Sequence, residues 1–585
     1  MKKKLLLVLF TSLVMLLAFG GISYVMYEKA KVVKEEEKKA AEQELDIFLE
    51  DSKKEVYDAR EITPITNLEK SVSAKTAYTT TYTEGKMQEI AKYKKKNLYD
   101  FESPLWMWDA FGTNHLSMYL YFKSTQPTYI KYSIQVQDDS VPNFTRTLYN
   151  GEKDNLTREH EYQLVGFIPG KQNLVILQMY DEKDQLLNKK VYSLYVPNLS
   201  SKADLKISVS KGRSEEQVSN GLYPVFGEKY IWFYDNSGIL RSEIPIEGRT
   251  SQRIFMEDGS MIYGLDVHRF VKVDGLGRVE NIYSIGKYFQ YSDFAYNGYG
   301  DLWILASKPG QKDKSIHDTV IALNLETKAV KELFSMDDFI PEMKKKAKKP
   351  KKDKYFNWVD LNSITQVKSD EMLVSSRELS TIFKIVNVNS RSPRLSYMIG
   401  EEKIWKGLTY AKRLLIKSGQ AEADEKQAEK QAESVLDLGE AKEVFLSQFG
   451  QTWIQTEQSS ELEDGQYYVY VWDSNFGYSP TRKKFKWDTF AKIGTIQKDA
   501  RRSYIKKYLV DENTATYQIE DTQEVTYTRT KGSTQFYGEN RIDNYGNQRS
   551  FAEYDSQGRM IRKFSHNQNG VLRVEKMDMK KFWFY

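Results

Sequence analysis

The stretch "FYDNSGILR" (residues 233–241) sets a pattern that the chain repeats: an Asp or Asn, two further residues and then a Gly, between apolar strand ends. The Asp or Asn side chain starts such a turn by bonding to its own backbone, and the Gly adopts the positive φ that closes it. Strand–turn–strand units repeated along a chain predict sheets arranged radially, and a β-propeller is the economical closed form. The other copies are "KVDGLGRVE" (272–280), "AYNGYGDLW" (295–303) and "EYDSQGRMI" (553–561).

The composition also favours a mainly β structure. Aromatic residues make up 13% of the 585 residues, with 40 Tyr, and flat amphipathic rings pack well on pleated surfaces. A chain of this length can form more than one domain with a sizeable core. It contains no cysteine, which excludes disulfides, thiolate zinc sites and a cysteine nucleophile.

The N-terminus predicts a membrane anchor over residues 1–27. "MKKK" precedes 22 residues without a charge (5–26), which is long enough to cross a bilayer as a helix. The lysines should remain cytoplasmic, so that the bulk of the chain lies outside the cell membrane after a single crossing. A cleaved signal peptide begins in the same way and is the alternative. The long apolar run, with no clear small-x-small site after it, favours the uncleaved anchor.

Four regions are expected along the chain. Residues 28–97 are charged and rich in helix formers, with apolar residues at helical spacing over 45–59, which predicts a juxtamembrane helix followed by a polar linker. Residues 98–205 alternate in short strands separated by turn residues, which is typical of a small β-sandwich. Residues 206–585 carry the repeated turns and form the predicted propeller.

Two charged inserts interrupt the propeller region, at 341–355 and 417–445. The first contains "KKKAKKPKKDK" (344–354), with eight Lys and one Asp, whereas the whole chain carries a net charge of +5. Since the positive charge is local, a globally basic nucleic-acid-binding protein is not expected. The lysine run fits either a disordered, solvated loop, which we favour, or a contact with an anionic wall or membrane surface. The second insert reads as a charged helix.

An arginine stands at the mouth of a predicted hairpin in "WVDLNSITQVKSDEMLVSSRELSTIFKI" (358–385), in which "EMLVSS" and "STIFKI" read as strands. Arg377 lies between them, and an arginine in that setting often serves as a fixed fork for sulfate, phosphate or carboxylate. A solvated turn arginine is the alternative, because most surface arginines bind nothing specific.

This central motif resembles the aryl-sulfate sulfotransferases of the cofactor-independent, extracytoplasmic type. The resemblance covers nearly the whole chain from about residue 98, and the central motif is its most specific part. Further similar segments are "DAFGTNHLSMYLYF" (109–122), "EHEYQLVGFIPGKQNLV" (159–175), "DGSMIYGLDVHRFVKVDGLGRV" (258–279), "YFQYSDFAYNGYGDLWILAS" (288–307), "QFGQTW" (448–453) and "GQYYVYVWDSNFG" (465–477).

The resemblance implies a sandwich domain in front of a six-bladed propeller, and pairing of two copies as a homodimer. It implies transfer of a sulfuryl group from one phenol's sulfate ester to another phenol, with no nucleotide donor and no cofactor or metal. Such a site needs a cation for the sulfate, a nucleophile such as imidazole, and a proton or positive charge for the departing phenolate. The family supplies these with an arginine, matched here by Arg377, and with several histidines at the centre of the propeller.

The family's histidines are replaced in this chain. Tyr291 and Ser292 stand where the family has His-His, Asp360 stands where it has a histidine before Asn-Ser, and Thr452 stands where it has the nucleophilic histidine of Gly-Gln-His. A threonine hydroxyl needs a strong neighbouring base to act as a nucleophile, and Asp360 would repel an incoming sulfate. Arg377, Asn362 and Gln451 are the expected ligand-binding residues.

The chain has five histidines, and none was expected to restore the site. His115 and His160 belong to the sandwich, where His160 is expected to satisfy a local hydrogen bond. His268 is expected to pack inside a strand. His317 and His566 occupy polar, loop-like stretches without a recognisable context.

Three functions fit these observations. The first is a degenerate family member, a pseudoenzyme that binds an anionic or aryl ligand, such as an aryl sulfate or a phenol, or a surface partner without turning it over. The second is an active aryl-sulfate sulfotransferase with an altered catalytic set that uses Tyr291, Thr452 and Arg377. The third is a structural component of a cell-envelope assembly.

Overall fold

The computed structural model describes residues 56–58, 71–201, 203–257, 259–418, 445–490, 492–498 and 502–585. Within these residues no helix is long and apolar enough to cross a membrane. The predicted anchor over 1–27, most of the predicted juxtamembrane helix, and nearly all of the insert at 417–445 lie outside the described residues. Where the chain is described it is mainly β, as the sequence predicts.

The region before the sandwich differs from the sequence prediction. Val56–Asp58, inside the expected juxtamembrane helix, forms strand β1 and pairs in parallel with β7. The expected polar linker contains helices α3 (Ala74–Ala77) and α4 (Thr80–Lys96). Thr79 caps α4 by accepting a hydrogen bond from the Tyr82 N–H, a cap that a threonine side chain commonly provides.

The predicted sandwich is built around one long strand that takes part in two sheets. The first half of β3 (Ser117–Gln135) pairs with β2 (Leu105–Trp108) and β5 (Thr157–Val165), and its second half pairs with β4 (Phe144–Thr147) and β6 (Lys171–Tyr180). β7 (Leu186–Val196) continues the second sheet. The register of β3 against β5 shifts between Lys123 and Thr128, a stretch that contains Pro127, which cannot donate to a ladder.

In the described part of the chain six further sheets follow, each made mainly of antiparallel strands that are neighbours in sequence. They contain β9 (Tyr223–Phe226), β10 (Tyr230–Tyr234) and β11 (Leu240–Pro245); β12 (Ile254–Glu257), β13 (Ser260–Asp266), β14 (Arg269–Asp274) and β15 (Val279–Ser284); β16 (Phe289–Tyr296), β17 (Asp301–Ser307), β18 (Thr319–Asn324) and β19 (Val330–Ser335); β20 (Leu361–Lys368), β21 (Glu371–Ser376), β22 (Thr381–Val386) and β23 (Arg394–Ile399); β24 (Ile416–Lys417), β25 (Trp453–Glu457), β26 (Gln466–Asp473), β27 (Arg502–Asp511) and β28 (Thr516–Thr526); and β29 (Gly532–Tyr537), β30 (Asn540–Tyr545), β31 (Ser550–Tyr554) and β32 (Met560–Ser565).

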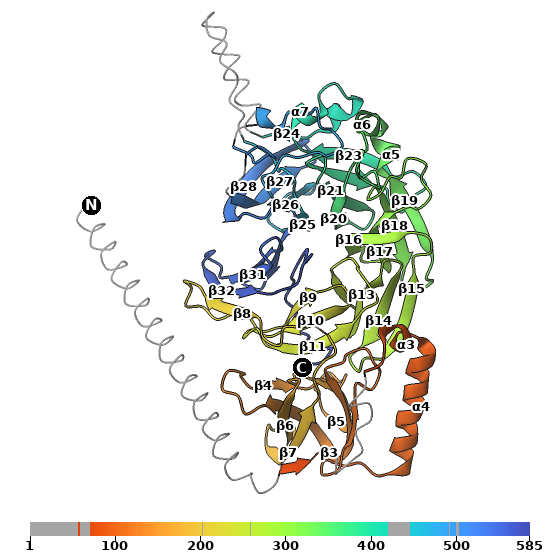
Figure 1. The fold of residues 1–585 in the computed structure, drawn as a ribbon, viewed down its shortest axis with the longest axis vertical. Coiled ribbons are helices and arrows are strands. Elements are labelled where there is room, and N and C mark those ends of the chain that lie inside the picture. The colour runs from red at the N-terminus through yellow and green to blue at the C-terminus, as the bar shows by residue number, and fades with distance from the viewer. Residues whose placement is uncertain are drawn as a thin grey trace, which may run out of the picture.

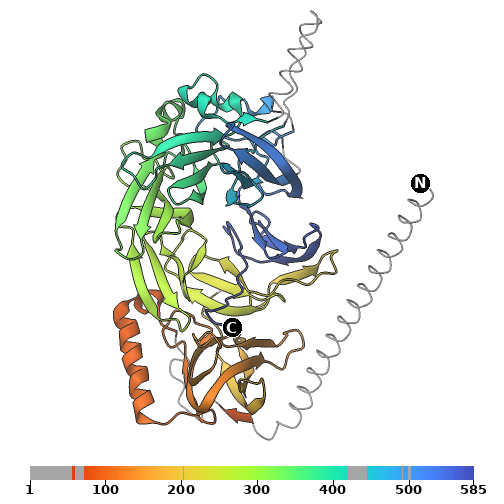
Figure 2. The same cartoon turned by 180° about the vertical axis from the view of Figure 1, so that it is seen from behind.

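These sheets follow a curve that begins and ends beside the sandwich (Figures 1 and 2). Strand β20 lies beside β16 of the sheet before it and beside β25 of the sheet after it. Strand β8 (Ser208–Lys211), which precedes the first sheet, pairs with β32 of the last one. The two ends of the array are therefore hydrogen-bonded into the same sheet.

The loop regions between sheets carry short helices, including one that replaces a predicted disordered loop. The lysine-rich insert at 341–355 begins with α6 (Pro341–Lys346) and is anchored by the buried side chains of Met343 and Phe356. The prediction of a disordered loop was therefore wrong, because apolar residues at both ends of the lysine run pack into the core. The remaining short helices are α5 (Met336–Phe339), α7 (Glu402–Trp405), η2 (Thr409–Arg413) and η3 (Trp487–Thr489).

The repeated turns have the geometry that the sequence predicts. In all four, the Oδ1 of the Asp or Asn accepts hydrogen bonds from the backbone N–H groups two and four residues further on. The closing residues Gly238, Gly277, Gly300 and Gly558 have φ between 73° and 90°. The turn is thus fixed locally, by one side chain and one left-handed glycine.

The C-terminal tail, residues 566–585, connects the last sheet to the first sheet and the sandwich. The Gln535 side chain donates to the Lys576 carbonyl and accepts from the Lys576 N–H. Met577 forms a β-bridge with Leu222, just before β9. Lys576 Nζ lies 2.8 Å from Glu553 Oε2, and both side chains are fully buried. Removing one partner of such a pair leaves a buried charge unpaired, so the contact holds the tail in place.

Two of the repeated turns provide a matched test of glycine's role. Gly558 and Gly277 both have positive φ, but a Cβ on Gly558 meets nothing within 4 Å, while a Cβ on Gly277 would lie 2.6 Å from both Thr113 Oγ1 and Gln163 Nε2 of the sandwich. We expect Gly558→Ala to lower the free energy of unfolding by about 1–2 kcal/mol, the cost of a left-handed alanine. Gly277→Ala should cost about 1–3 kcal/mol more through steric overlap.

Urea unfolding of the two variants beside the wild type measures this difference. Equal losses for both variants would mean that the turn of β14 and β15 does not depend on close contact with the sandwich.

Candidate functional site

The first strand of the third sheet is bulged where the family's paired histidines were expected. The register of β16 against β17 shifts between Gln290 and Phe294, and Ser292 within this bulge has φ of 48°. A bulge of this kind redirects side chains and is common beside functional sites. Here it places Asp293 in the protein interior, fully buried, and leaves Ser292 on the wall of a cavity.

Arg377 occupies the turn between β21 and β22, as the sequence predicts. Its backbone N–H donates to Asp360 O at 3.1 Å, and its C=O accepts from Ser380 N–H at 3.3 Å. Ser376 Oγ donates to the Val359 carbonyl and accepts from the Leu379 N–H. The turn is therefore fixed by main-chain contacts, which leaves the guanidinium group available for a ligand.

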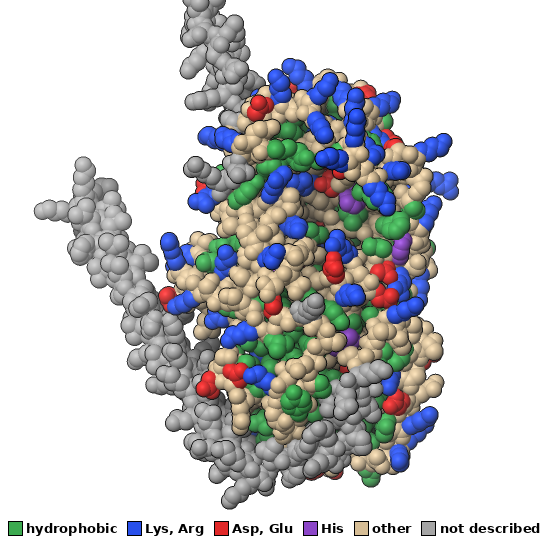
Figure 3. Space-filling model, in the orientation of Figure 1, with side chains coloured by type: hydrophobic (Ala, Val, Ile, Leu, Met, Phe, Trp, Pro, Cys, Tyr) green, Lys and Arg blue, Asp and Glu red, His purple; other side chains and the backbone are tan. Residues whose placement is uncertain are grey.

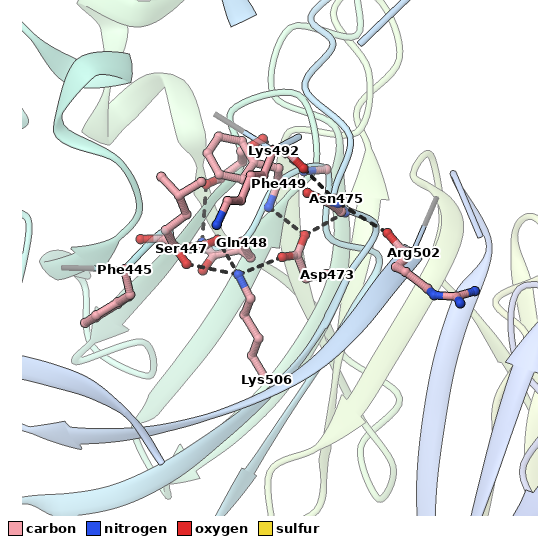
Figure 4. Close-up of polar contacts among 12 residues, drawn as sticks. Phe445, Ser447, Gln448, Phe449, Asp473, Asn475, Lys492, Arg502 and Lys506 are labelled. Atoms are coloured by element: carbon pink, nitrogen blue, oxygen red, sulfur yellow. Dashed lines mark hydrogen bonds and ion pairs between the residues drawn. The ribbon is translucent and has the colours of Figure 1, made fainter. Parts of the chain in front are cut away.

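The segment that carries Gln451 and Thr452 is held from below by a buried ion pair (Figure 4). Lys506 Nζ lies 2.8 Å from Asp473 Oδ2 and donates to the carbonyls of Leu446 and Ser447. Asp473 Oδ1 accepts from the Phe449 N–H at 2.8 Å. Because a charged pair in a dry interior is held firmly only when its remaining hydrogen-bonding positions are filled, these contacts fix the path of the segment from 446 to 449.

One cavity of about 180 Å³ brings the predicted site residues together. Its lining comes from four successive sheets and from the C-terminal tail, and includes the family-equivalent positions Ser292, Asp360, Arg377 and Thr452. The volume is far larger than the ~10–15 Å³ that one water needs. The complete lining is Ser292, Asp360, Asn362, Arg377, Thr452, Thr530, Lys531, Leu572 and Arg573.

The charge of this lining is positive, with Arg377, Lys531 and Arg573 against the single carboxylate of Asp360. The Nε atoms of Arg377 and Arg573 are both buried and have no hydrogen-bond partner within the described residues. Arg573 is held from the other side, since its Nη2 lies 3.0 Å from the buried Asp293 Oδ2. A cavity lined by two guanidinium groups and one ammonium group is suited to binding an oxyanion.

His317 lies beside this cavity, and the sequence did not predict this position for it. Its Nδ1 is 3.5 Å from Asp360 Oδ1, and its ring stacks on Tyr291 with centroids 3.8 Å apart. Burial opposes ionisation of Asp360, but the His317 imidazole, the Arg377 guanidinium and the Asn357 amide together lower the pKa of this carboxyl. Asp360 thus pairs with His317. The family resemblance had led us to expect a histidine at position 360 itself.

Tyr291 cannot supply a phenolate near neutral pH. Burial, and then the negative charges of Asp360 and Asp318, raise the pKa of its hydroxyl well above the ordinary value. The hydroxyl is buried and has no hydrogen-bond partner among the described residues. In this environment Tyr291 keeps its proton and is not a nucleophile.

Two predicted site residues have structural contacts in place of the expected role. Thr452 Oγ1 donates to Gly532 O at 2.7 Å and accepts from the Gly532 N–H at 3.2 Å, which joins two neighbouring sheets. Gln451 does not line the cavity, because its Nε2 donates to the carbonyls of Ser376 and Thr381 beneath the Arg377 turn. That Gln451 binds a ligand stays a prediction.

Asn362 lines the cavity. Its Nδ2 donates one of its two N–H groups to Gln451 O at 2.7 Å, while its Oδ1 is buried and has no partner within the described residues. The bond to Gln451 fixes the amide beside the Thr452 segment.

A larger hollow of about 1480 Å³ adjoins the cavity and shares Ser292, Lys531 and Leu572 with it. Aromatic side chains are prominent on its wall, and His317 is also part of it. These aromatic residues are Phe226, Tyr230, Trp232, Tyr291 and Tyr355.

The remaining histidines do not take part in the site. His160 bonds to Thr128 and Tyr162 inside the sandwich, in agreement with its expected local role. His268 lies in the turn between β13 and β14, not inside a strand, and bonds to Tyr288 O. His566 and His115 are buried away from the cavity. No group of three or more potential metal ligands is present among the described residues.

The sequence missed Lys531, Arg573 and His317 for one reason. Each reaches the cavity or its margin from a segment without a local motif, and only the tertiary fold brings these segments together. Only the positive φ of His317 (57°) marks it in the structure as an unusual position.

Glu378, the residue after Arg377, is expected to make stability depend on pH. It is 2% exposed, and burial raises its pKa to about 7 although the Thr481 hydrogen bonds and Arg482 act in the opposite direction. The folded protein keeps this proton up to about pH 7, while the unfolded chain releases it near its ordinary value of 4.5. Stability attributable to Glu378 is therefore present at pH 4.5 and below, and is lost as pH rises toward and through 7.

Glu378→Gln should remove up to about 3 kcal/mol of that loss, so that the variant melts above the wild type at pH 8 and level with it at pH 5. Thermal unfolding at the two pH values measures this, with the exposed Glu402→Gln as control. An unchanged pH dependence in Glu378→Gln would show that the carboxyl is ionised in the folded protein.

Comparison with known families gives two matches. A family model described as arylsulfotransferase (ASST) matches residues 208–582, and a model described as the arylsulfotransferase Ig-like domain matches residues 105–197. The first match alone covers more than half of the chain and includes every residue of the cavity lining. No curated protein matches the sequence.

Several solved structures are similar at low identity. A functionally unknown protein from Desulfotomaculum acetoxidans is 7% identical, with 68% of this chain and 95% of that chain covered and a TM-score of 0.32. BamB from Moraxella catarrhalis is 8% identical, with 65% and 99% covered and a TM-score of 0.28. An auxiliary nutrient binding protein from Bacteroides thetaiotaomicron is 8% identical, with 78% and 86% covered and a TM-score of 0.29. Similarities at this level carry no argument about fold or function.

Proposed function

Since this chain belongs to the arylsulfotransferase family, we propose that its six sheets are the blades of a closed propeller and that the cavity binds the anionic head of an organic sulfate. The six sheets occur in chain order, and β8 joins the last of them. That pairing is the kind of contact that closes a propeller between its first and last strands.

The observation that carries the binding proposal is the group of three cations that line one cavity. Arg377, Lys531 and Arg573 are all part of the lining, against the single carboxylate of Asp360. Charge-assisted hydrogen bonds from such groups to an oxyanion are among the stronger ones in proteins. An aryl sulfate fits both halves of the site, with its sulfate in the cavity and its ring toward the aromatic wall of the hollow.

Binding without turnover is supported by what the lining lacks. No histidine is part of the lining that the structure describes, and the Thr452 hydroxyl is occupied by Gly532. Asp360 stays ionised near neutral pH, because its pKa is lowered, so it cannot give a proton to a departing phenolate. These features favour a pseudoenzyme that holds its ligand.

Arg377→Ala should weaken binding of 4-nitrophenyl sulfate at least tenfold, because the fork that faces the sulfate is removed. Isothermal titration of the full-length chain measures the affinity. Arg394→Ala, an exposed arginine on β23, is the matched control and should bind as the wild type does. Equal affinity of wild type and Arg377→Ala, or equal affinity for 4-nitrophenol and its sulfate, would contradict the proposal.

A second candidate, active transfer with an altered catalytic set, is favoured by one observation. His317 is paired with Asp360 and borders the hollow, an arrangement in which a carboxylate orients an imidazole as a base. In such a reaction the bond between sulfur and the donor's phenol oxygen breaks while a new bond forms to the acceptor's oxygen. His317 takes the acceptor's proton, and Arg377 balances the charge of the transferring group.

If transfer occurs, His317→Ala should lower the rate of 4-nitrophenolate release at least a hundredfold while affinity for 4-nitrophenyl sulfate stays within about twofold, because loss of a general base affects the transition state only. His268→Ala is the control. Release measured with and without a phenol acceptor decides between the candidates: absence of release from the wild type supports the binding function, and release unaffected by His317→Ala excludes this base.

We also propose that residues 1–27 anchor the protein in the cell membrane with the bulk of the chain outside, and that two copies pair as a homodimer. The anchor is supported by the 22 uncharged residues after "MKKK". The homodimer is supported by the family resemblance alone.

A further inference from the structure

Three loops from separate sheets form one strongly basic surface, which we call the basic collar: residues 341–356, 401–413 and 477–490. They contain 16 Lys and Arg against five Asp and Glu, while the whole chain has a net charge of only +5. Fourteen of the 16 basic side chains are exposed. Lys and Arg side chains gather over the upper end of the molecule in Figure 3, where Figure 1 places α6 and α7.

Direct contacts join the three loops to one another. Thr409 Oγ1 donates to Glu342 Oε1 at 2.8 Å, which links the second loop to the first. The Lys348 N–H donates to Thr481 O at 2.8 Å, which links the first loop to the third. The collar is therefore a single surface whose shape is set by main-chain and side-chain hydrogen bonds.

The collar also adjoins the Arg377 turn. Thr481 donates to the Glu378 carboxyl through both its N–H and its hydroxyl, and Arg482 Nη2 donates to Glu378 O at 3.2 Å. Tyr355, in the first loop, lines the hollow that shares Lys531 with the cavity. A ligand can thus extend from the cavity, across the hollow, to the collar.

Several exposed lysines of the collar have no carboxylate partner, in contrast to Lys344. Lys344 is half-buried and pairs with Asp313 and Asp337. Lys345, Lys346, Lys351 and Lys352 make no ion pair with any described residue. Clustered like charges repel one another and disfavour the compact state, so an anionic partner would remove a cost that the fold carries.

We propose that the collar binds a linear anionic polysaccharide, bearing sulfate or phosphate groups, one of whose anionic groups enters the Arg377 cavity. This assignment rests on the proposed function for the cavity itself. A polymer fits better than a membrane surface, because the hollow recedes behind the collar and a flat bilayer would leave it unfilled. Tyr355 is the single large apolar side chain among the collar's described residues that is exposed, whereas interfacial binding needs several.

The test compares two sets of lysine-to-glutamine substitutions in the full-length chain. The collar variant is K345Q/K346Q/K351Q/K352Q, and the control variant is K92Q/K95Q/K96Q/K183Q, four exposed lysines on α4 and the sandwich. Both lose the same charge. Each is titrated with dextran sulfate, polyphosphate, uncharged dextran, 4-nitrophenyl sulfate and vesicles of phosphatidylglycerol.

The collar variant should bind dextran sulfate at least tenfold more weakly than the wild type, and the slope of log affinity against log salt should fall by about three, since four fewer cations release counterions. The control variant should match the wild type. Binding of 4-nitrophenyl sulfate should be unchanged in the collar variant and lost in Arg377→Ala. Polyphosphate in place of dextran sulfate shows whether sulfate or phosphate is preferred.

Equal losses in the collar and control variants would overturn the proposal, because net charge alone would then explain binding. Vesicles that bind more tightly than dextran sulfate would assign the collar to a membrane. The two proposals fail separately: dextran sulfate binding that depends on the collar, with no binding of 4-nitrophenyl sulfate, keeps the collar and removes the function proposed for the cavity.

Discussion

Asp293 is the residue on which the site depends most. It is fully buried, and its carboxylate accepts from Ser363 Oγ and the Ile364 N–H on β20 while it pairs with Arg573 of the tail at 3.0 Å and with Arg253 at 3.3 Å. A buried carboxylate is stable only when its oxygens are filled in this way. One side chain therefore ties together two neighbouring sheets, the segment before β12 and the C-terminal tail.

This arrangement explains how a tail residue becomes part of the cavity. Asp293 and Glu575 hold the Nη groups of Arg573, which fixes this side chain in the cavity lining. Three residues after Arg573, the buried ion pair between Lys576 and Glu553 fixes the tail. The positive character of the cavity is thus built from the interior outward, and the same ion pairs that stabilise the array of sheets orient the groups that face a ligand.

The sequence predicted what is decided locally. The repeated turns of the form Asp/Asn-x-x-Gly depend on residues a few positions apart, so their geometry can be read from the sequence. The position of the Arg377 turn between two strands was also predicted, but its bonds to Val359 and Asp360 were not. Lys531, Arg573 and His317 could not be found in this way, because their positions depend on contacts between segments far apart in the chain. The bonds of Gln451 to the Ser376 and Thr381 carbonyls of a neighbouring sheet are likewise contacts that the sequence does not reveal.

The helices α3 and α4 and the ordered lysine-rich loop were missed for a related reason. Polar or charged composition predicts solvation but not disorder, and a few apolar residues are enough to fix such a segment against a core. In the lysine-rich loop Met343 and Phe356 provide that anchorage, and the charges between them are left on the surface.

The replacement of the family's histidine by Asp360 changes the electrostatics less than the sequence alone suggests. A carboxylate next to Arg377 would by itself weaken the attraction for an anion, but Asp360 also faces His317 at 3.5 Å and accepts from Asn357 at 2.7 Å. Part of the negative charge of Asp360 is therefore engaged by His317 and Asn357. Lys531 and Arg573 add two cations to the lining, so the cavity keeps an excess of positive charge and can favour an anionic ligand even without the family's histidines.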